Sequence, residues 1–115
     1  MAFLFGPGAG GGGGGTNQED YNWPATTITA DYTATESDYN IFVDTSGGAV
    51  TITFPDPSTF TNPRREFRVI IKDGSNSTFI DAGVGTTIDT QPSGSPTELF
   101  TAKIITSDGS DYFTI

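Results

Sequence analysis

The sequence contains no cysteine and no histidine, and these two absences remove much of the usual chemistry of protein sites. Without cysteine there is no disulfide framework, no thiolate nucleophile and no thiolate metal ligand. Without histidine the commonest general base and the commonest transition-metal ligand are both missing. We therefore expect no enzymatic role, no cofactor and no metal, and the function has to be inferred from architecture.

Basic residues are also scarce, with five Lys and Arg against fourteen Asp and Glu, for a formal charge of −9. Phosphate binding depends mainly on clustered Lys and Arg, so this balance argues against a nucleic-acid partner. Three arginines do cluster, at Arg64, Arg65 and Arg68, but Glu66 lies among them. We expect these arginines to form ion pairs with a partner subunit.

Long hydrophobic runs are missing as well. The opening MAFLFGPGAGGGGGGT has no basic region and too few apolar residues for a signal peptide or a membrane span, which predicts no membrane insertion. We interpret residues 1–20 as an extended arm, with an apolar segment, Met1–Phe5, on a glycine tract, Gly6–Gly15. A flexible linker of about 15 residues reaches roughly 20 Å. Its apolar residues, Phe3, Leu4 and Phe5, are therefore predicted to dock on a partner subunit.

The rest of the chain, 21–115, is rich in residues that favour strands. It contributes most of the 19 threonines, nine phenylalanines and four tyrosines, and no window of a dozen residues has a helical apolar period. The clearest pattern is Tyr39–Phe54, where two apolar triplets with a spacing of two flank Thr-Ser-Gly-Gly. This pattern predicts a β-hairpin.

Further strands are predicted in six segments: Ala25–Thr35, Phe67–Asp73 with Thr78–Asp81, Thr86–Asp89, and Glu98–Thr106 paired with Asp111–Ile115 across an Asp-Gly turn. In the second segment Ile70 falls on the face that should be wet, which suggests that another sheet or chain covers it. About eight strands result. The fold class is therefore all-β, a small antiparallel sandwich or barrel with a Gly-rich N-terminal arm.

Two segments outside the predicted strands are candidates for binding. Tyr21 and Trp23 precede Pro24 and could stack on sugar rings, although Trp23 as a lid over the core is the favoured interpretation. The Gly-, Ser- and Pro-rich loop, Ala82–Pro96, is the other candidate for glycan contact. The loop PDPSTFTNP carries three prolines and is excluded from a central ladder, with Phe60 expected to anchor it to the core.

Acidic residues offer two further chemistries. Five aspartates could supply the carboxylate pair of a glycosidase, but most lie where turns favour Asp: Asp38, Asp44, Asp56, Asp81 and Asp89. The runs Asp73-Gly-Ser-Asn-Ser and Asp108-Gly-Ser-Asp could bind calcium, but neither has EF-hand spacing. Turn formation explains both sets.

The run SDYNIFVDTSGGAVTITFPDP, followed by NPRREFRVIIKDGSNS, TTID and ITSDGSDYFTI, resembles a β-module found in bacteriophage virion appendages such as tail-fibre and head-fibre segments. The resemblance covers about the last eighty residues. Its elements fall at Tyr39–Pro55, Asn62-Pro63, Phe67–Asp73, Thr86–Asp89 and Ser107–Ile115. The sequence departs from the family pattern at Arg64, where a glycine is usual, and at Phe113 in the last hairpin.

The resemblance implies a structural virion protein, assembled in the host cytoplasm and without enzymatic activity. It further implies a homotrimer that contacts other virion proteins such as capsid, portal or tail subunits. The apolar arm fits this role, since it would dock a fibre, tail-attached or capsid-decorating module. The alternative is a host-recognition module that binds glycans.

Overall fold

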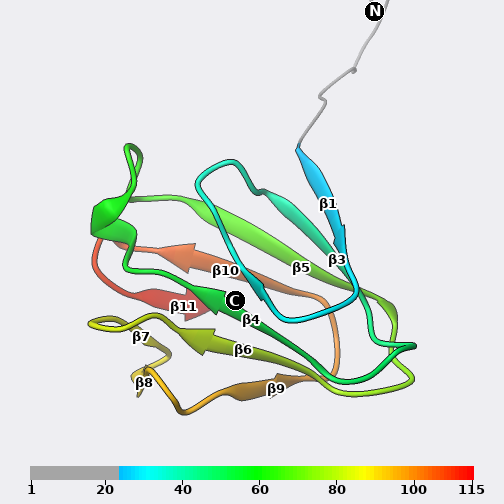
Figure 1. Ribbon diagram of the computed structural model, residues 1–115. Coiled ribbons are helices and arrows are strands. Elements are labelled where there is room, and N and C mark those ends of the chain that lie inside the picture. Colours follow the sequence, from blue (N-terminus) through cyan, green and yellow to red (C-terminus); the bar gives the residue numbers. More distant parts are fainter. Residues whose placement is uncertain (1–23) are drawn as a thin grey trace, which may run out of the picture.

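The computed structural model describes residues 24–115, which fold into two β-sheets packed face to face (Figure 1). The larger sheet has seven strands in the order β1 (Ala25–Ile28), β3 (Asn40–Asp44), β5 (Glu66–Asp73), β10 (Lys103–Ser107), β11 (Tyr112–Thr114), β7 (Thr87–Ile88) and β8 (Gln91–Pro92). The smaller sheet has the order β2 (Tyr32–Thr33), β4 (Val50–Phe54), β6 (Thr78–Ala82) and β9 (Thr97–Leu99). One 3₁₀ turn, η1 (Pro57–Thr59), follows β4. The predicted all-β fold is confirmed, and of the sandwich and the barrel it is the sandwich that forms. The predicted antiparallel pairing is wrong for five of the nine strand pairs, which are parallel because the chain crosses to the other sheet between neighbouring strands.

The first six strands alternate between the two sheets. Strands β1, β3 and β5 lie in the larger sheet, and β2, β4 and β6 lie in the smaller one. The chain therefore forms three arches, in each of which it crosses from the larger sheet to the smaller one. The first arch is β1 and β2, the second is β3 and β4, and the third is β5 and β6. The arches stack in parallel, because β3 pairs with both β1 and β5, and β4 pairs with both β2 and β6, all in the parallel sense.

The second and third arches repeat each other closely. Asn40 pairs with Arg68 in the larger sheet and Val50 pairs with Thr78 in the smaller sheet, so both shifts are 28 residues. The register slips once, between Val43 and Asp44, because β5 has an extra residue, Lys72, at that point. The turn of the second arch is one residue longer than that of the third, which restores the shift of 28 residues at Val50. The sequence thus contains a structural repeat.

The C-terminal strands close the stack in the opposite sense. Strand β10 runs antiparallel to β5, and β9 runs antiparallel to β6. Strand β11 forms a hairpin with β10, and Ser107 pairs with Tyr112 across the turn. The hairpin predicted around Asp108-Gly109 is therefore confirmed, but its first strand begins at Lys103, because Glu98 and Leu99 belong to β9 in the other sheet.

The hairpin predicted for Tyr39–Phe54 is wrong. Strands β3 and β4 lie in different sheets and have no ladder between them. A hairpin and an arch have the same sequence pattern, two apolar triplets around a small-residue turn, and differ only in whether the backbones or the side chains of the two strands meet. The segment Ala25–Thr35 is likewise two strands, because the bend at Thr29-Ala30 carries the chain between sheets.

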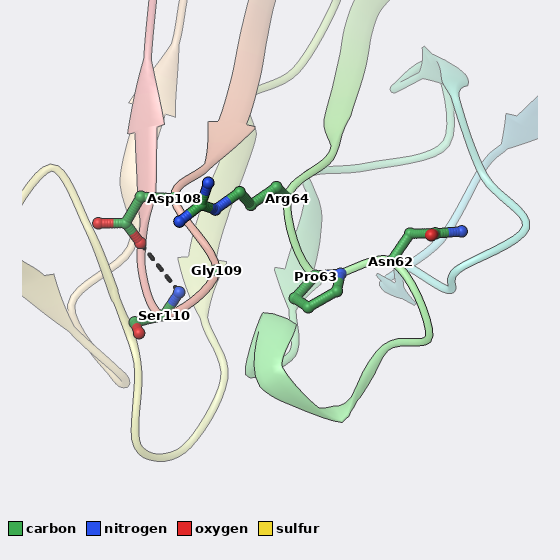
Figure 2. A pocket seen from close by; sticks show the side chains of 6 residues that line it. All are labelled: Asn62, Pro63, Arg64, Asp108, Gly109 and Ser110. Carbon is green, nitrogen blue, oxygen red and sulfur yellow. Dashed lines mark hydrogen bonds between the residues drawn. The ribbon is translucent and has the colours of Figure 1, made fainter.

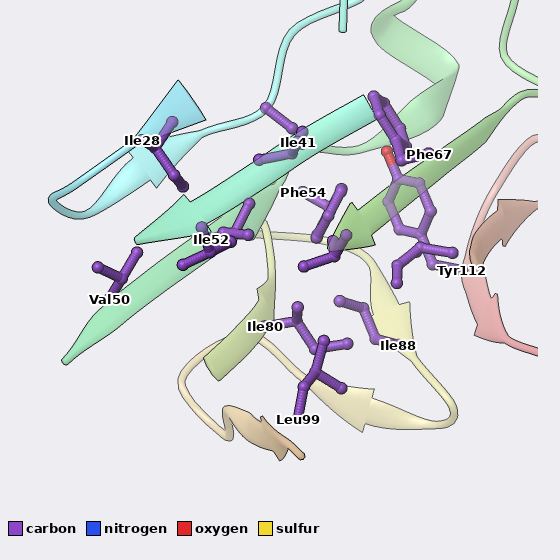
Figure 3. Packing of buried hydrophobic residues seen from close by; sticks show 14 of the residues in the cluster. Ile28, Ile41, Val50, Ile52, Phe54, Phe67, Ile80, Ile88, Leu99 and Tyr112 are labelled. Carbon is purple, nitrogen blue, oxygen red and sulfur yellow. The ribbon is translucent and has the colours of Figure 1, made fainter. Parts of the chain in front are cut away.

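The core lies between the sheets, where side chains from both meet (Figure 3). Its centre is an aromatic cluster with ring centroids 5.1 Å apart for Phe54 and Phe67, and 5.6 Å apart for Phe54 and Tyr112. Tyr112 is fully buried, and its hydroxyl donates to the backbone oxygen of Pro55. Phe60 packs against this cluster from the loop after η1, as expected. These contacts fix the two sheets against each other.

Four turns share one device, an Asp whose carboxylate accepts the N–H of a Ser two residues later. It occurs in Asp44-Thr-Ser, Asp56-Pro-Ser, Asp73-Gly-Ser and Asp108-Gly-Ser. Such Asx turns replace a backbone turn bond. The aspartates thus hold the ends of strands β3, β4, β5 and β10.

Candidate interaction surface

The candidate sites of residues 24–115 lie in cavities at the turns and on one face of the seven-stranded sheet. A cavity of about 540 Å³ opens between the loop Asn62–Arg64 and the β10–β11 turn (Figure 2). These are two of the segments that carry the resemblance. The Ser107 hydroxyl joins them, because it donates to the Pro63 backbone oxygen and accepts from the Gly109 N–H.

The polar groups that the β10–β11 turn contributes to this cavity are engaged within the turn itself. The Asp108 carboxylate accepts the N–H groups of Asp111 and Ser110, and these bonds, with help from the charge of Arg64, hold the pKa of Asp108 below its ordinary value. Gly109 has a φ of 104°, which a side chain would strain. We interpret this cavity as the by-product of a tight turn.

A second cavity, of about 410 Å³, lies at the end of the sheets where the turns of the second and third arches meet. Phe100 lines it and is 81% exposed, while Asn76 and Glu98 supply polar groups. An exposed aromatic ring beside amide and carboxylate groups has the composition of a sugar subsite.

An apolar surface lies on the side of the seven-stranded sheet that faces away from the smaller sheet. We call this side the outer face; its apolar members alternate with buried neighbours and are Phe42, Ile70, Ile104, Phe113 and Ile115. Phe113 is 40% exposed and Ile115 is 72% exposed. A cavity of about 280 Å³ lies in its middle, lined by Arg68, Ile70, Ala102, Ile104 and Ile115, among others.

Cross-strand pairing explains why these residues gather. Ile70 lies opposite Phe42 of β3, and Ile104 lies opposite Arg68. The N–H of Ile115 donates to the Ile104 backbone oxygen, which places the end of the chain beside β10. Apolar side chains gathered on one sheet face, with Phe113 and Ile115 exposed, make this face a candidate contact surface. The predicted placement of Ile70 on the second face is confirmed, and within residues 24–115 that face is not covered by another sheet.

The three clustered arginines lie in different environments. Arg65 packs its guanidinium over the Phe67 ring, 4.7 Å from the centroid, and donates to the Asp38 backbone oxygen. Arg68 lies on the outer face over the Tyr39 ring, and Arg64 lines the turn cavity. They do not form one cationic patch.

Among the carboxylates of residues 24–115, Asp38 is the most buried, at 4% exposure. It accepts from the Thr26 hydroxyl, the Tyr32 hydroxyl, and both the N–H and the hydroxyl of Thr35. Burial, and then the bond to Asp38, raise the pKa of Tyr32. The network ties the first arch together, and its carboxylate is occupied by donors from its own chain.

The other aspartates named as possible glycosidase carboxylates are also occupied. Asp44 and Asp56 accept serine N–H groups, Asp81 accepts the Gly94 N–H, and Asp89 accepts the Thr114 N–H. Within residues 24–115 no group of three or more acidic side chains could hold a metal ion. Both runs considered for calcium, at Asp73 and Asp108, form Asx turns.

The residues predicted to dock or to bind sugars, Phe3, Leu4, Phe5, Tyr21 and Trp23, lie outside the described part of the chain. The loop Ala82–Pro96 is described, and it contains β7 and β8 and the exposed Val84. Sequence reasoning missed Phe100, Phe113 and Ile115. The signal for the last two was present, because Phe113 and Ile115 alternate with buried Tyr112.

No helix in the described part of the chain has the length and apolar character needed to cross a membrane. No protein-family model matches the chain, and no match was found among curated proteins or solved structures.

Proposed function

We propose that this chain is a structural subunit of a bacteriophage particle, a fibre, tail-attached or capsid-decorating module that assembles through the outer face of its seven-stranded sheet. The observation that carries the proposal is that face, where Ile104 and Ile115 line an apolar cavity beside Arg68. An apolar centre with an arginine is the usual composition of a protein contact surface.

The stack of arches supports a mechanical role. Parallel ladders join three successive arches in each sheet, and the side chains of turns and of Asp38 are used to hold these ladders. Because these carboxylates accept hydrogen bonds from the chain's own backbone, they are not available to bind or activate a substrate. The resemblance of Tyr39–Ile115 to virion appendage modules points to the same role, with a homotrimer and neighbouring virion proteins as partners.

The role in the particle is tested by proteomics of purified phage. We expect peptides of this chain in the particles, at a fixed ratio to the major capsid protein that withstands a salt wash. Recovery only from the unassembled lysate would refute the proposal. Light scattering on the purified chain tests the trimer separately.

The outer face is tested by single substitutions in the same particles. Ile104→Ser should lower incorporation at least tenfold, because a hydroxyl replaces an apolar contact at the centre of the face. Val84→Ser is the matched control, since Val84 is 89% exposed on a different loop. Equal incorporation of both variants would remove the outer face from the assembly.

Glycan binding is the second candidate, and Phe100 is the observation that favours it. Its ring is exposed beside Asn76 and Glu98, in the cavity at the arch turns. If this cavity binds sugars, Phe100→Ala should abolish binding on a glycan array and Phe113→Ala should preserve it. A protein that binds no glycan before substitution would rule this candidate out.

A further inference from the structure

We propose that in the unassembled subunit the outer face is covered by the chain's own apolar segment, Met1–Phe5, seated in the cavity between β5 and β10. The inference rests on the proposed role of this face as a contact surface. It adds a means of regulation, because the arm and the face would become available to partners together.

The cavity suits an apolar peptide. Side chains of Ile70, Ile104 and Ile115 line it, together with Ala102, and its charged groups are Arg68 and Lys103. Segment 1–15 contains no charged side chain, so its side chains can enter such a site without desolvating a charge. Met1–Phe5 is also the one apolar run of the sequence that precedes the described residues.

The register of the sheet places the start of β1 in line with this cavity. Ala25 pairs with Asn40, Asn40 pairs with Arg68, and Arg68 pairs with Ile104. The chain therefore enters the sheet on the same cross-strand row as the cavity, two strands away from β5. Neighbouring strands lie about 4.8 Å apart, so β5 is roughly 10 Å from β1.

The connecting segment is long enough to return. Eighteen residues, 6–23, separate Phe5 from Pro24, and eleven of the first twelve positions after Phe5 are Gly, Pro, Ala or Thr. A Gly-rich linker of this length has a root-mean-square span of roughly 20–25 Å. This exceeds the distance to the cavity and requires no stretching.

The length of segment 6–23 also indicates whether the cavity is occupied by the arm of the same chain or by the arm of a second copy. A tether of this kind holds its end at an effective concentration of order millimolar. At about 1 μM protein, the arm of another molecule is roughly a thousandfold more dilute. The arm of the same chain therefore occupies the cavity until a partner displaces it.

The absence of native cysteine permits a direct test with the full chain. The variant Leu4→Cys/Ala102→Cys places one thiol on the arm and one at the cavity, and Ala102 is small and exposed, so the cavity keeps its isoleucines. The matched control is Leu4→Cys/Ala49→Cys, because Ala49 is also an exposed alanine, on the turn of the second arch. Disulfide formation under mild oxidant at 1 μM is followed by mass spectrometry.

We expect the Ala102 variant to form its intramolecular disulfide at least tenfold faster than the Ala49 variant. Adding Phe3→Ser and Phe5→Ser should reduce this ratio to about one, because the apolar anchors are then lost. Equal rates in the two double-cysteine variants would overturn the proposal. So would a disulfide that forms equally fast between separate chains carrying Leu4→Cys and Ala102→Cys.

The test uses the isolated protein, so it separates this inference from the proposed function. If the arm does not seat but Ile104→Ser still blocks incorporation, the contact surface stands and self-covering is rejected. If the arm seats but the particles contain none of the chain, self-covering stands and the virion role is rejected.

Discussion

Thr45 and Asn76 join the turns of two stacked arches through reciprocal hydrogen bonds. The Thr45 hydroxyl lies 2.8 Å from the backbone oxygen of Asp73 and 2.9 Å from that of Asn76, so its one proton is shared between them, and it accepts the Asn76 N–H. The Asn76 side-chain amide donates in return to the Thr45 backbone oxygen. Thr45 is fully buried, so these bonds replace water for four backbone groups at the point where the ladders end.

The Thr45 hydroxyl should therefore be costly to remove. Thr45→Val keeps the shape of the side chain but leaves the Asn76 N–H and two carbonyls with one partner fewer. We expect a loss of about 2–3 kcal/mol in the free energy of unfolding, measured by urea denaturation. Thr45→Ser keeps the hydroxyl and is the control. A loss as large in Thr45→Ser as in Thr45→Val would assign the effect to the methyl group instead.

Thr78 should behave in the opposite way. It lies opposite Val50 in the parallel ladder, is 1% exposed, and its hydroxyl finds no partner within residues 24–115. Thr78→Val removes an unsatisfied polar atom and adds an apolar one, so the free energy of unfolding should stay level or rise by about 1 kcal/mol. Urea denaturation of Thr78→Val and Thr45→Val under the same conditions measures the two changes in the free energy of unfolding. A large loss in Thr78→Val would show that the hydroxyl has a partner.

The turn around Thr45 separates what the sequence predicts, the strands, from what it does not predict, the way in which they are connected. The spacing of apolar residues predicted two strands within Tyr39–Phe54, and the structure has them at Asn40–Asp44 and Val50–Phe54. The predicted inward positions are buried except Tyr39, which precedes the first strand. The same spacing cannot distinguish a hairpin from an arch. That choice depends on Thr45, a polar residue buried inside the turn, whose partner lies 31 positions away.

The candidate surface was less predictable than the fold. Ile70 signalled a covered outer face because it interrupts an alternating strand, but Phe113 and Ile115 reach that face only through the pairing of β10 with β11. The sequence predicted a turn at each of the Asp-x-Ser aspartates separately. Their repetition at four strand ends needed the structure, because nothing in one turn indicates where the next strand pairs.

The Asp108 turn should make stability depend on pH in the acid range. Hydrogen bonds from the N–H groups of Asp111 and Ser110 lower the pKa of Asp108 from 3.8, so the folded state favours the ionised form. A lowered pKa stabilises the fold above the ordinary value, and this stability is lost as the pH falls through the pKa of the folded state. Glu36, whose carboxylate accepts the Thr61 N–H, acts in the same sense.

Asp108→Asn isolates this contribution. The amide oxygen can still accept the two N–H groups, but it does not titrate, so the loss of stability between pH 6 and about pH 3 should be smaller than in the unsubstituted protein. Urea midpoints across this range measure it. Ser110→Ala keeps both the carboxylate and the backbone donors and should retain the full pH dependence. An unchanged slope in Asp108→Asn would exclude the turn as a source of it.

Gly83 is required by the close approach of two chain segments. Its N–H donates to the Phe54 backbone oxygen, and a Cβ at this position would lie 2.8 Å from the Pro55 Cα. Gly83→Ala must push the end of β6 away from Pro55, whose backbone oxygen holds the Tyr112 hydroxyl. We expect a loss of about 1–3 kcal/mol in the free energy of unfolding, as for other overpacked sites.

Gly47→Ala is the matched control for Gly83→Ala, because nothing lies within 4 Å of a Cβ at Gly47 and its φ is not positive. Urea denaturation should therefore give a change of less than about 0.5 kcal/mol for Gly47→Ala, or a small gain from the reduced entropy of the unfolded chain. The distinction is between crowding and backbone freedom. If both alanines destabilise the fold equally, the end of β6 has room to move and the approach to Pro55 does not restrict position 83.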